Sequence, residues 1–158
     1  MGDFVAVNRR NYVAYREELA AWPGVRFISY DERESNNYQY VVVEWDEAVT
    51  GISRDDVLAI LHAENVLARR YFFPGCHRME PYRSLSPRAG ERLPQTERLA
   101  ARVIALPTGT SVTRAEVDGV CAILRNVLKH ATTIRARLRH GDHGARDESR
   151  RGSHEGSA

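Results

Sequence analysis

Apolar and polar positions alternate along the first third of this chain in two rhythms, one typical of a helix and one typical of strands. Residues 3–21 carry apolar groups every three or four positions, which predicts an amphipathic helix, although polar Asn11 interrupts its apolar stripe. A Trp-Pro-Gly sequence at 22–24 ends this helix, because proline and glycine interrupt helical structure. Residues 25–30 and 38–45 are rich in β-branched and aromatic residues and predict two strands.

A second helix is predicted to begin at Ser53. Ser53 and Asp56 have the spacing of a capping box, with Asp in place of the usual Glu, and apolar positions then line one side of the helix through Leu61. Residues 66–73 predict a third strand. Residues 74–92 contain three prolines and are interpreted as a long loop.

The last part of the pattern is again helical. The proline at 94 occupies the first-turn position that proline favours, and it opens a short helix over 95–102. Thr113 and Glu116 form a second capping box and start the last helix. Helical spacing of apolar residues in this last helix persists to Leu138.

A short strand at 103–106 completes an order typical of an α+β domain, in which a small sheet carries helices on one face. We assign this domain to residues 1–130. Residues 131–158 are expected to form a helical extension and then a disordered Arg- and His-rich tail, because no apolar residue beyond Gly141 is larger than alanine. The second face of the sheet has no evident cover in the pattern, so we expect the domain to dock on another surface.

The composition narrows the classes of function. A chain of 158 residues fits one domain, and short apolar runs such as Tyr40–Val43 predict no membrane-spanning helix and no membrane partner. The start of the chain has no apolar signal core, and two distant cysteines form no disulfide framework, so a cytoplasmic location is expected. The net charge of +2 is too small to argue for nucleic acid as a partner.

The stretch RRYFFPGCHRMEPYR, residues 69–83, is the richest in reactive and binding side chains. Side chains of neighbours such as Cys76 and His77 diverge in extended chain, and no further ligands stand at zinc spacing, so we predict neither a Cys–His nucleophile nor a metal site. Cys76 is interpreted as a small buried residue. His77 follows a Pro-Gly turn at the end of a strand, where a side chain can face a cleft. Arg69 and Arg70 point to opposite faces of a strand, so at most one of them serves any one site.

Four segments together resemble the C-terminal part of the DegT/DnrJ/StrS family of sugar aminotransferases, which depend on pyridoxal phosphate (PLP). The resemblance covers residues 3–128 in the family's order, in the segments FVAVNRRNYVAYREELAAWPGVRF, NYQYVVVEWDE, SRDDVLAILHAENVLARRYFFPGCHRMEPY and LPQTERLAARVIALPTGTSVT. It implies the C-terminal small domain of type I fold aminotransferases. It also implies amination of a keto sugar linked to a nucleotide, dTDP being expected, in deoxyaminosugar biosynthesis.

The resemblance implies roles for two residues. His77 stands where the family places a pocket histidine, and with Tyr71 on the preceding strand it is expected to bind substrate. PLP transamination needs a lysine that forms a Schiff base, but Lys129 is the only lysine and lies outside the family's lysine motif. We therefore expect no catalytic or cofactor-binding residue in this chain. The chain would then work only with a large-domain chain, or it is a part cut from a longer parent. The expected partner is a large-domain chain or a homo-oligomer.

Two other interpretations stay open at this point. The first is a non-catalytic remnant or interaction module that is folded like the small domain and docks without turnover. The second is a nucleic-acid-binding protein that uses the arginines, since every basic residue except Lys129 is arginine. Acidic residues interrupt the basic tail, which weakens this second interpretation.

Overall fold

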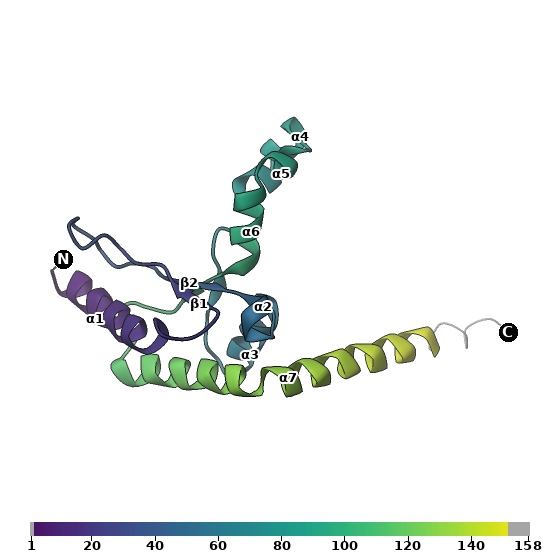
Figure 1. The fold of residues 1–158 in the computed structure, drawn as a ribbon. Coiled ribbons are helices and arrows are strands. Elements are labelled where there is room, and N and C mark those ends of the chain that lie inside the picture. Colours follow the sequence, from purple (N-terminus) through teal and green to yellow (C-terminus); the bar gives the residue numbers. More distant parts are fainter. Residues whose placement is uncertain (1, 152–158) are drawn as a thin grey trace.

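The computed structural model describes the backbone of residues 2–151 and the side chains of residues 4–138 (Figure 1). The end of the predicted tail, residues 152–158, lies outside the described residues. The α+β class with a small sheet is confirmed. The elements in chain order are α1 (Gly2–Leu19), β1 (Val25–Phe27), β2 (Val41–Trp45), α2 (Glu47–Thr50), α3 (Arg54–Ala63), β3 (Arg69–Arg70), the 3₁₀ helix η1 (Cys76–Arg78), α4 (Tyr82–Leu85), α5 (Ala89–Arg92), α6 (Pro94–Arg102), β4 (Val103–Leu106) and α7 (Arg114–Arg151).

The four strands form one antiparallel sheet in the order β1-β2-β4-β3. The central pair aligns Val41 with Leu106 and Val43 with Ile104, so apolar side chains of both strands reach the same face. These side chains are buried in the core, which explains why the β-branched runs fold as the two middle strands.

The third predicted strand is shorter in the structure than the 66–73 segment that the sequence suggested. Only Arg69 and Arg70 pair with β4. Phe72 has a left-handed backbone with φ of 51°, which an extended strand cannot contain. The chain therefore leaves the sheet after Arg70 and turns toward the segment that carries His77.

Helices α1, α3 and α7 cover one face of the sheet (Figure 1). Val41, Val43 and Trp45 of β2 point to this face and are buried there. Asn11 interrupts the apolar stripe of α1 because it makes a specific connection. Its Nδ2 donates to two carbonyl oxygens of the loop before α7, at 3.3 and 3.1 Å, which ties the first helix to the last.

Both predicted helix starts are confirmed in atomic detail. The backbone N–H of Asp56 donates to Ser53 Oγ at 3.1 Å, at the start of α3. At the start of α7, the backbone N–H of Thr113 donates to Glu116 Oε2 at 2.6 Å, and the N–H of Glu116 donates back to Thr113 Oγ1 at 3.3 Å. Each arrangement satisfies N–H groups that the first turn of a helix leaves unpaired.

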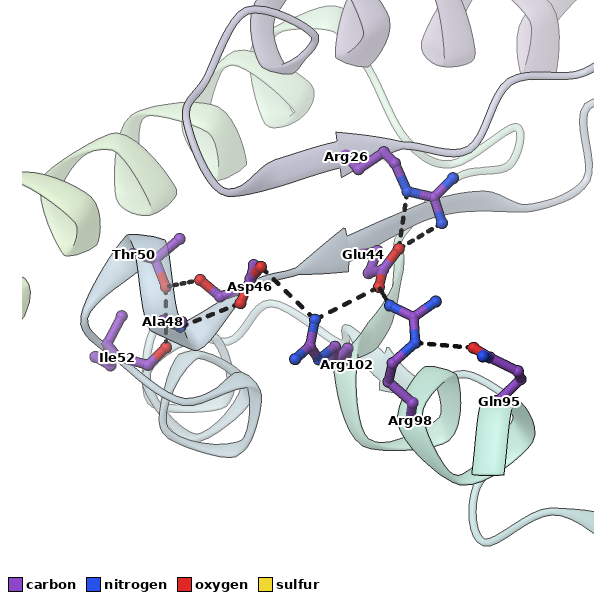
Figure 2. Close-up of polar contacts among 9 residues, drawn as sticks. All are labelled: Arg26, Glu44, Asp46, Ala48, Thr50, Ile52, Gln95, Arg98 and Arg102. Atoms are coloured by element: carbon purple, nitrogen blue, oxygen red, sulfur yellow. Dashed lines mark hydrogen bonds and ion pairs between the residues drawn. The ribbon is translucent and has the colours of Figure 1, made fainter. Parts of the chain in front are cut away.

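The second face of the sheet has a partial cover that the sequence pattern did not reveal. Glu44 points to this face with a side chain only 7% exposed, and arginines from two elements converge on it (Figure 2). Arg26 of β1 donates to Glu44 Oε2 through both Nε and Nη2, and Arg98 of α6 donates to Oε1 at 2.9 Å. Arg102 bridges Glu44 and Asp46 at 4.0 and 3.6 Å. This Glu44 cluster holds α6 against the sheet.

Beyond α6, the predicted loop 74–92 contains η1, α4 and α5, which together with α6 rise from the sheet as an arm (Figure 1). On the opposite side α7 runs past α1 and α3 and projects beyond them, with non-helical backbone at His130. Its helical backbone continues past Gly141, further than the sequence analysis expected. In the part of the chain that the structure describes, no helix is long and apolar enough to cross a membrane.

Candidate functional site

A cavity of about 840 Å³ lies between the second face of the sheet and the arm. Its floor is formed by residues of β1, β2 and β4, and its walls by the segment after β3 and by α4, α5 and α6. Most lining side chains are apolar, which is typical of small-molecule pockets and of docking surfaces. The lining residues are Arg26, Ile28, Val42, Tyr71, Phe72, Gly75, Cys76, His77, Tyr82, Leu85, Ser86, Ala89, Leu93, Thr96, Leu99, Ala100 and Val103.

His77 lies in η1 with its ring against the wall of this cavity, and its side chain is 8% exposed. Its Nε2 lies 2.6 Å from Oε1 of Glu97, in the first turn of α6. The close fit depends on Gly75, whose φ is +90°. A Cβ at position 75 would stand 2.7 Å from Cε1 of His77 and would clash with the ring. The positive φ would also strain the backbone of any residue other than glycine.

Glu97 accepts hydrogen bonds from two neighbouring residues of η1. Arg78 donates from Nε to the same Oε1 at 2.6 Å. Hydrogen bonds from Arg78 and from His77 lower the pKa of Glu97 from its ordinary 4.5 to about 2. Glu97 is therefore a carboxylate at neutral pH, and it joins α6 to the segment that carries His77.

Tyr71 lines the same cavity as His77, so the structure brings the two predicted substrate-side residues to one site. The ring of Tyr71 contacts Tyr40 and Phe72, with ring centroids 5.3 and 4.1 Å apart. Burial raises the pKa of the Tyr71 hydroxyl, so this hydroxyl stays protonated and able to donate a hydrogen bond at neutral pH.

The interpretation of Cys76 as a buried residue is wrong. Cys76 is exposed at the start of η1 and lines the cavity, because nothing in the arm covers the first turn of this short helix. The buried cysteine is Cys121 of α7, where burial raises the pKa of the thiol to about 12. Cys121 is thus a small core residue of the kind that Cys76 was expected to be.

The paired arginines before Tyr71 have different surroundings. Arg70 donates to Asp55 at 2.9 Å, and its guanidinium lies 4.8 Å from the centre of the Phe73 ring. Arg69 lines two other hollows of the surface and not the cavity with His77. Neither arginine belongs to the lining of the candidate site, so the arginine pair does not contribute a phosphate contact there.

The cavity does not by itself fit PLP. Its lining contains no lysine for a Schiff base and no carboxylate to pair with a pyridine nitrogen. Lys129, the only lysine of the chain, is exposed on α7 and is not among the lining residues. Among the side chains that the structure describes, no three His, Cys, Asp or Glu residues come together as metal ligands.

Several polar residues of this region were not identified from the sequence. Glu97 stands in the LPQTERLAARVIALP segment, and its acidic place in the first turn of a helix was the available signal. Arg54 is buried and donates through Nη1 to the carbonyl oxygens of Ala100 and Val103, each at 3.0 Å. Arg54 thereby fixes the junction between α6 and β4, and with it the base of the arm.

Large apolar side chains are exposed around the cavity. Phe72 is 73% exposed and Leu85 is 78% exposed, although both line it. Tyr82 and Leu93 also line the cavity and are exposed. Leu67 and Phe73 are exposed at a separate hollow. A gathering of exposed apolar groups marks an interaction surface.

Comparisons with known proteins agree with this fold. The family model for the DegT/DnrJ/EryC1/StrS aminotransferase family matches residues 1–125. The chain belongs to this family.

The individual relatives include a transaminase and two proteins of known structure. The dTDP-4-amino-4,6-dideoxy-D-glucose transaminase of Escherichia coli is 29% identical over 110 residues, which are 70% of this chain and 29% of the relative. DesI, solved in the presence of its TDP-sugar product, is 48% identical with a TM-score of 0.77, over 87% of this chain and 34% of DesI. DesV of S. venezuelae, solved with a ketimine intermediate, shares the fold at 20% identity and a TM-score of 0.69, over 80% of this chain and 32% of DesV. The chain thus spans about a third of the length of these relatives.

Proposed function

We propose that this chain forms the C-terminal portion of a PLP-dependent nucleotide-sugar aminotransferase, which aminates a keto sugar linked to dTDP. The observation that carries the proposal is the position of His77 and Tyr71 on one cavity of a domain that is 48% identical to DesI. The name of the E. coli relative and the TDP-sugar product of DesI support a nucleotide-linked sugar as substrate.

In this proposal the chain supplies one wall of the active site. Tyr71 offers a hydroxyl and His77 an imidazole for hydrogen bonds to the sugar, while the apolar lining excludes water around them. The chain itself contributes no Schiff-base group, because no lysine lines the cavity. PLP, when the remaining portion of the enzyme binds it, supplies the electron sink for transamination.

The remaining portion would dock on the exposed apolar surface of the arm. A large-domain chain, or a second copy of a chain that contains that domain, is the partner that this surface fits, and the assembly would work in the cytoplasm. The exposure of Phe72 and Leu85 supports such docking, because burying large apolar side chains against a partner lowers the free energy of the assembly.

Borohydride reduction in the presence of PLP tests the proposal. The chain alone, treated with PLP and borohydride and then mapped by mass spectrometry, is expected to show no efficient label at a single site, because Lys129 is not among the residues that line the cavity. Co-expressed with a large-domain chain of the family, the complex is expected to aminate a dTDP-linked keto sugar with glutamate as a trial amino donor. Turnover by the chain alone would overturn the division of roles. Complex formation without turnover would favour a non-catalytic interaction module.

A further inference from the structure

The contact between His77 and Glu97 fixes which ring nitrogen carries the proton. Glu97 is ionised, since hydrogen bonds from Arg78 and His77 hold its pKa near 2. An ionised carboxylate only accepts hydrogen bonds. At 2.6 Å from Oε1 of Glu97, Nε2 of His77 must therefore be the donor and carry hydrogen.

The other ring nitrogen is left in a different state. When His77 is neutral, Nδ1 keeps its lone pair and can only accept a hydrogen bond. When His77 is protonated, Nδ1 becomes a donor while Nε2 continues to donate to Glu97. Within the described chain no hydrogen bond to Nδ1 accompanies the one at Nε2.

Glu97 itself is held from outside the pair. Arg78 donates to the same oxygen at 2.6 Å, and the start of α6 places Glu97 beside η1. The His77 side chain is 8% exposed, and its Cε1 and Nδ1 atoms lie beside Gly75. A Cβ at position 75 would stand 3.0 Å from Nδ1, so the glycine leaves the space beside this nitrogen free. The orientations of His77 and Glu97 are therefore each fixed by a further contact, as is required of a positioned catalytic or binding group.

We propose that Glu97 is a positioning residue that holds His77 in its Nε2–H form, so that Nδ1 is the nitrogen available to the substrate. This inference rests on the proposed function, because it assigns the orientation of a residue placed at the sugar pocket. It differs from a pair in which the imidazole is protonated, because both ring nitrogens would then carry hydrogen and Nδ1 could not accept a hydrogen bond from the substrate.

The tautomer can be measured in the 158-residue chain without the rest of the enzyme. The chain is labelled with ¹⁵N-histidine and studied by imidazole ¹H–¹⁵N correlation NMR at about pH 8, where an ordinary imidazole is neutral. We expect His77 to show a protonated Nε2 and an unprotonated Nδ1. We also expect a slowly exchanging Nε2 proton with a downfield resonance, as a short bond to a carboxylate produces.

The variant Glu97→Gln removes the constraint, because an amide can both donate to and accept from an imidazole. In this variant the population of the minor tautomer is expected to rise about tenfold relative to the natural chain, in line with the strength of hydrogen bonds to charged groups. Glu80→Gln is the matched control, since Glu80 lies in the same segment but accepts from Arg83 and Ser84 instead. Amide spectra of both variants report that the fold is intact.

A natural chain with hydrogen on Nδ1, or a Glu97→Gln chain with unchanged tautomer populations and an unchanged Nε2 proton, would overturn the inference. The proposed function fails differently. If the NMR result is as expected but His77→Ala leaves turnover of the assembled enzyme unchanged, then Glu97 orients a histidine that does not serve the substrate.

Discussion

His77 can have one of two roles. It can act on the substrate, or it can be a structural residue that holds η1 against α6. Its contact with Glu97 at 2.6 Å supports either role, because a fixed histidine is both a good structural partner and a well-oriented polar group. The two roles have different consequences when the imidazole is removed, and these consequences can be separated.

We predict that His77→Ala reduces turnover of the assembled enzyme more than it reduces the folded fraction. A side chain that transfers a proton in the transition state contributes about 10²–10⁴-fold in rate, and a hydrogen-bond donor contributes less. A purely structural histidine would instead cost roughly 1–3 kcal/mol of stability as its partner loses a hydrogen bond. Melting temperature and turnover measured on the same samples decide the matter. Unchanged turnover per folded molecule would make His77 structural.

At this scale the sequence predicted the position of His77 but not its partner. A Pro-Gly turn after a strand and the family's histidine motif are local signals, and they were sufficient to select His77 and Tyr71. Glu97 lies 20 residues further along, and the pair forms only when α6 packs beside η1. Cys76 was misjudged for a related reason, since burial depends on what the rest of the fold places over a residue.

Among the secondary-structure elements, α6 is the one that determines the shape of the site. It forms a wall of the cavity, carries Glu97, and is held on the sheet by the Glu44 cluster (Figure 2). Glu44 is a buried carboxylate, and such a group is stable only when cations or donors satisfy it. Arg98 and Arg102 of α6 provide these cations, so the cluster links the position of the arm to the sheet.

We predict that Glu44→Gln destabilises the domain by about 1–2 kcal/mol, because Arg26 and Arg98 lose their anionic partner and keep only hydrogen bonds to a neutral amide. Solvent around these half-exposed arginines limits the loss. Urea denaturation measures this effect. Hydrogen exchange should also quicken first in α6, since the cluster is its attachment to the sheet. Glu91→Gln serves as control, because the exposed Arg88–Glu91 pair contributes at most about 0.5 kcal/mol. If Glu44→Gln and Glu91→Gln reduced stability equally, the Glu44 cluster would not be what attaches α6 to the sheet.

Elements whose signals are local were predicted well, and elements that depend on distant contacts were not. The capping boxes at Ser53 and Thr113 each lie within four residues of sequence, and both helices begin where these boxes stand. The predicted end of the third strand was wrong. The turn into the arm gives Phe72 a left-handed backbone, and the apolar periodicity contains no signal for this turn. The Glu44 cluster joins residues of β1, β2 and α6 and was likewise invisible in the pattern.

On the scale of the whole molecule, the apolar core and the apolar arm have opposite character. The core between the sheet and α1, α3 and α7 is closed, with Trp45 and Leu124 fully buried. The arm rises away from it (Figure 1). Its apolar side chains are exposed around the cavity. The sequence analysis found no cover for the second sheet face, whereas the structure places α6 over part of that face and joins it there through the Glu44 cluster.

We predict that the exposed apolar surface of the arm makes the isolated chain associate with itself, and that a large-domain chain of the family competes with this association. Sedimentation velocity over a range of concentrations measures the self-association. The double substitution Phe72→Ser and Leu85→Ser should weaken it by about tenfold or more, since each side chain that would be buried contributes roughly 1.5–3 kcal/mol. Val49→Ser is the matched control, because Val49 is 59% exposed on α2 and does not line the cavity. A monodisperse monomer at all concentrations, not stabilised by the large-domain chain, would show that this surface is not a docking surface.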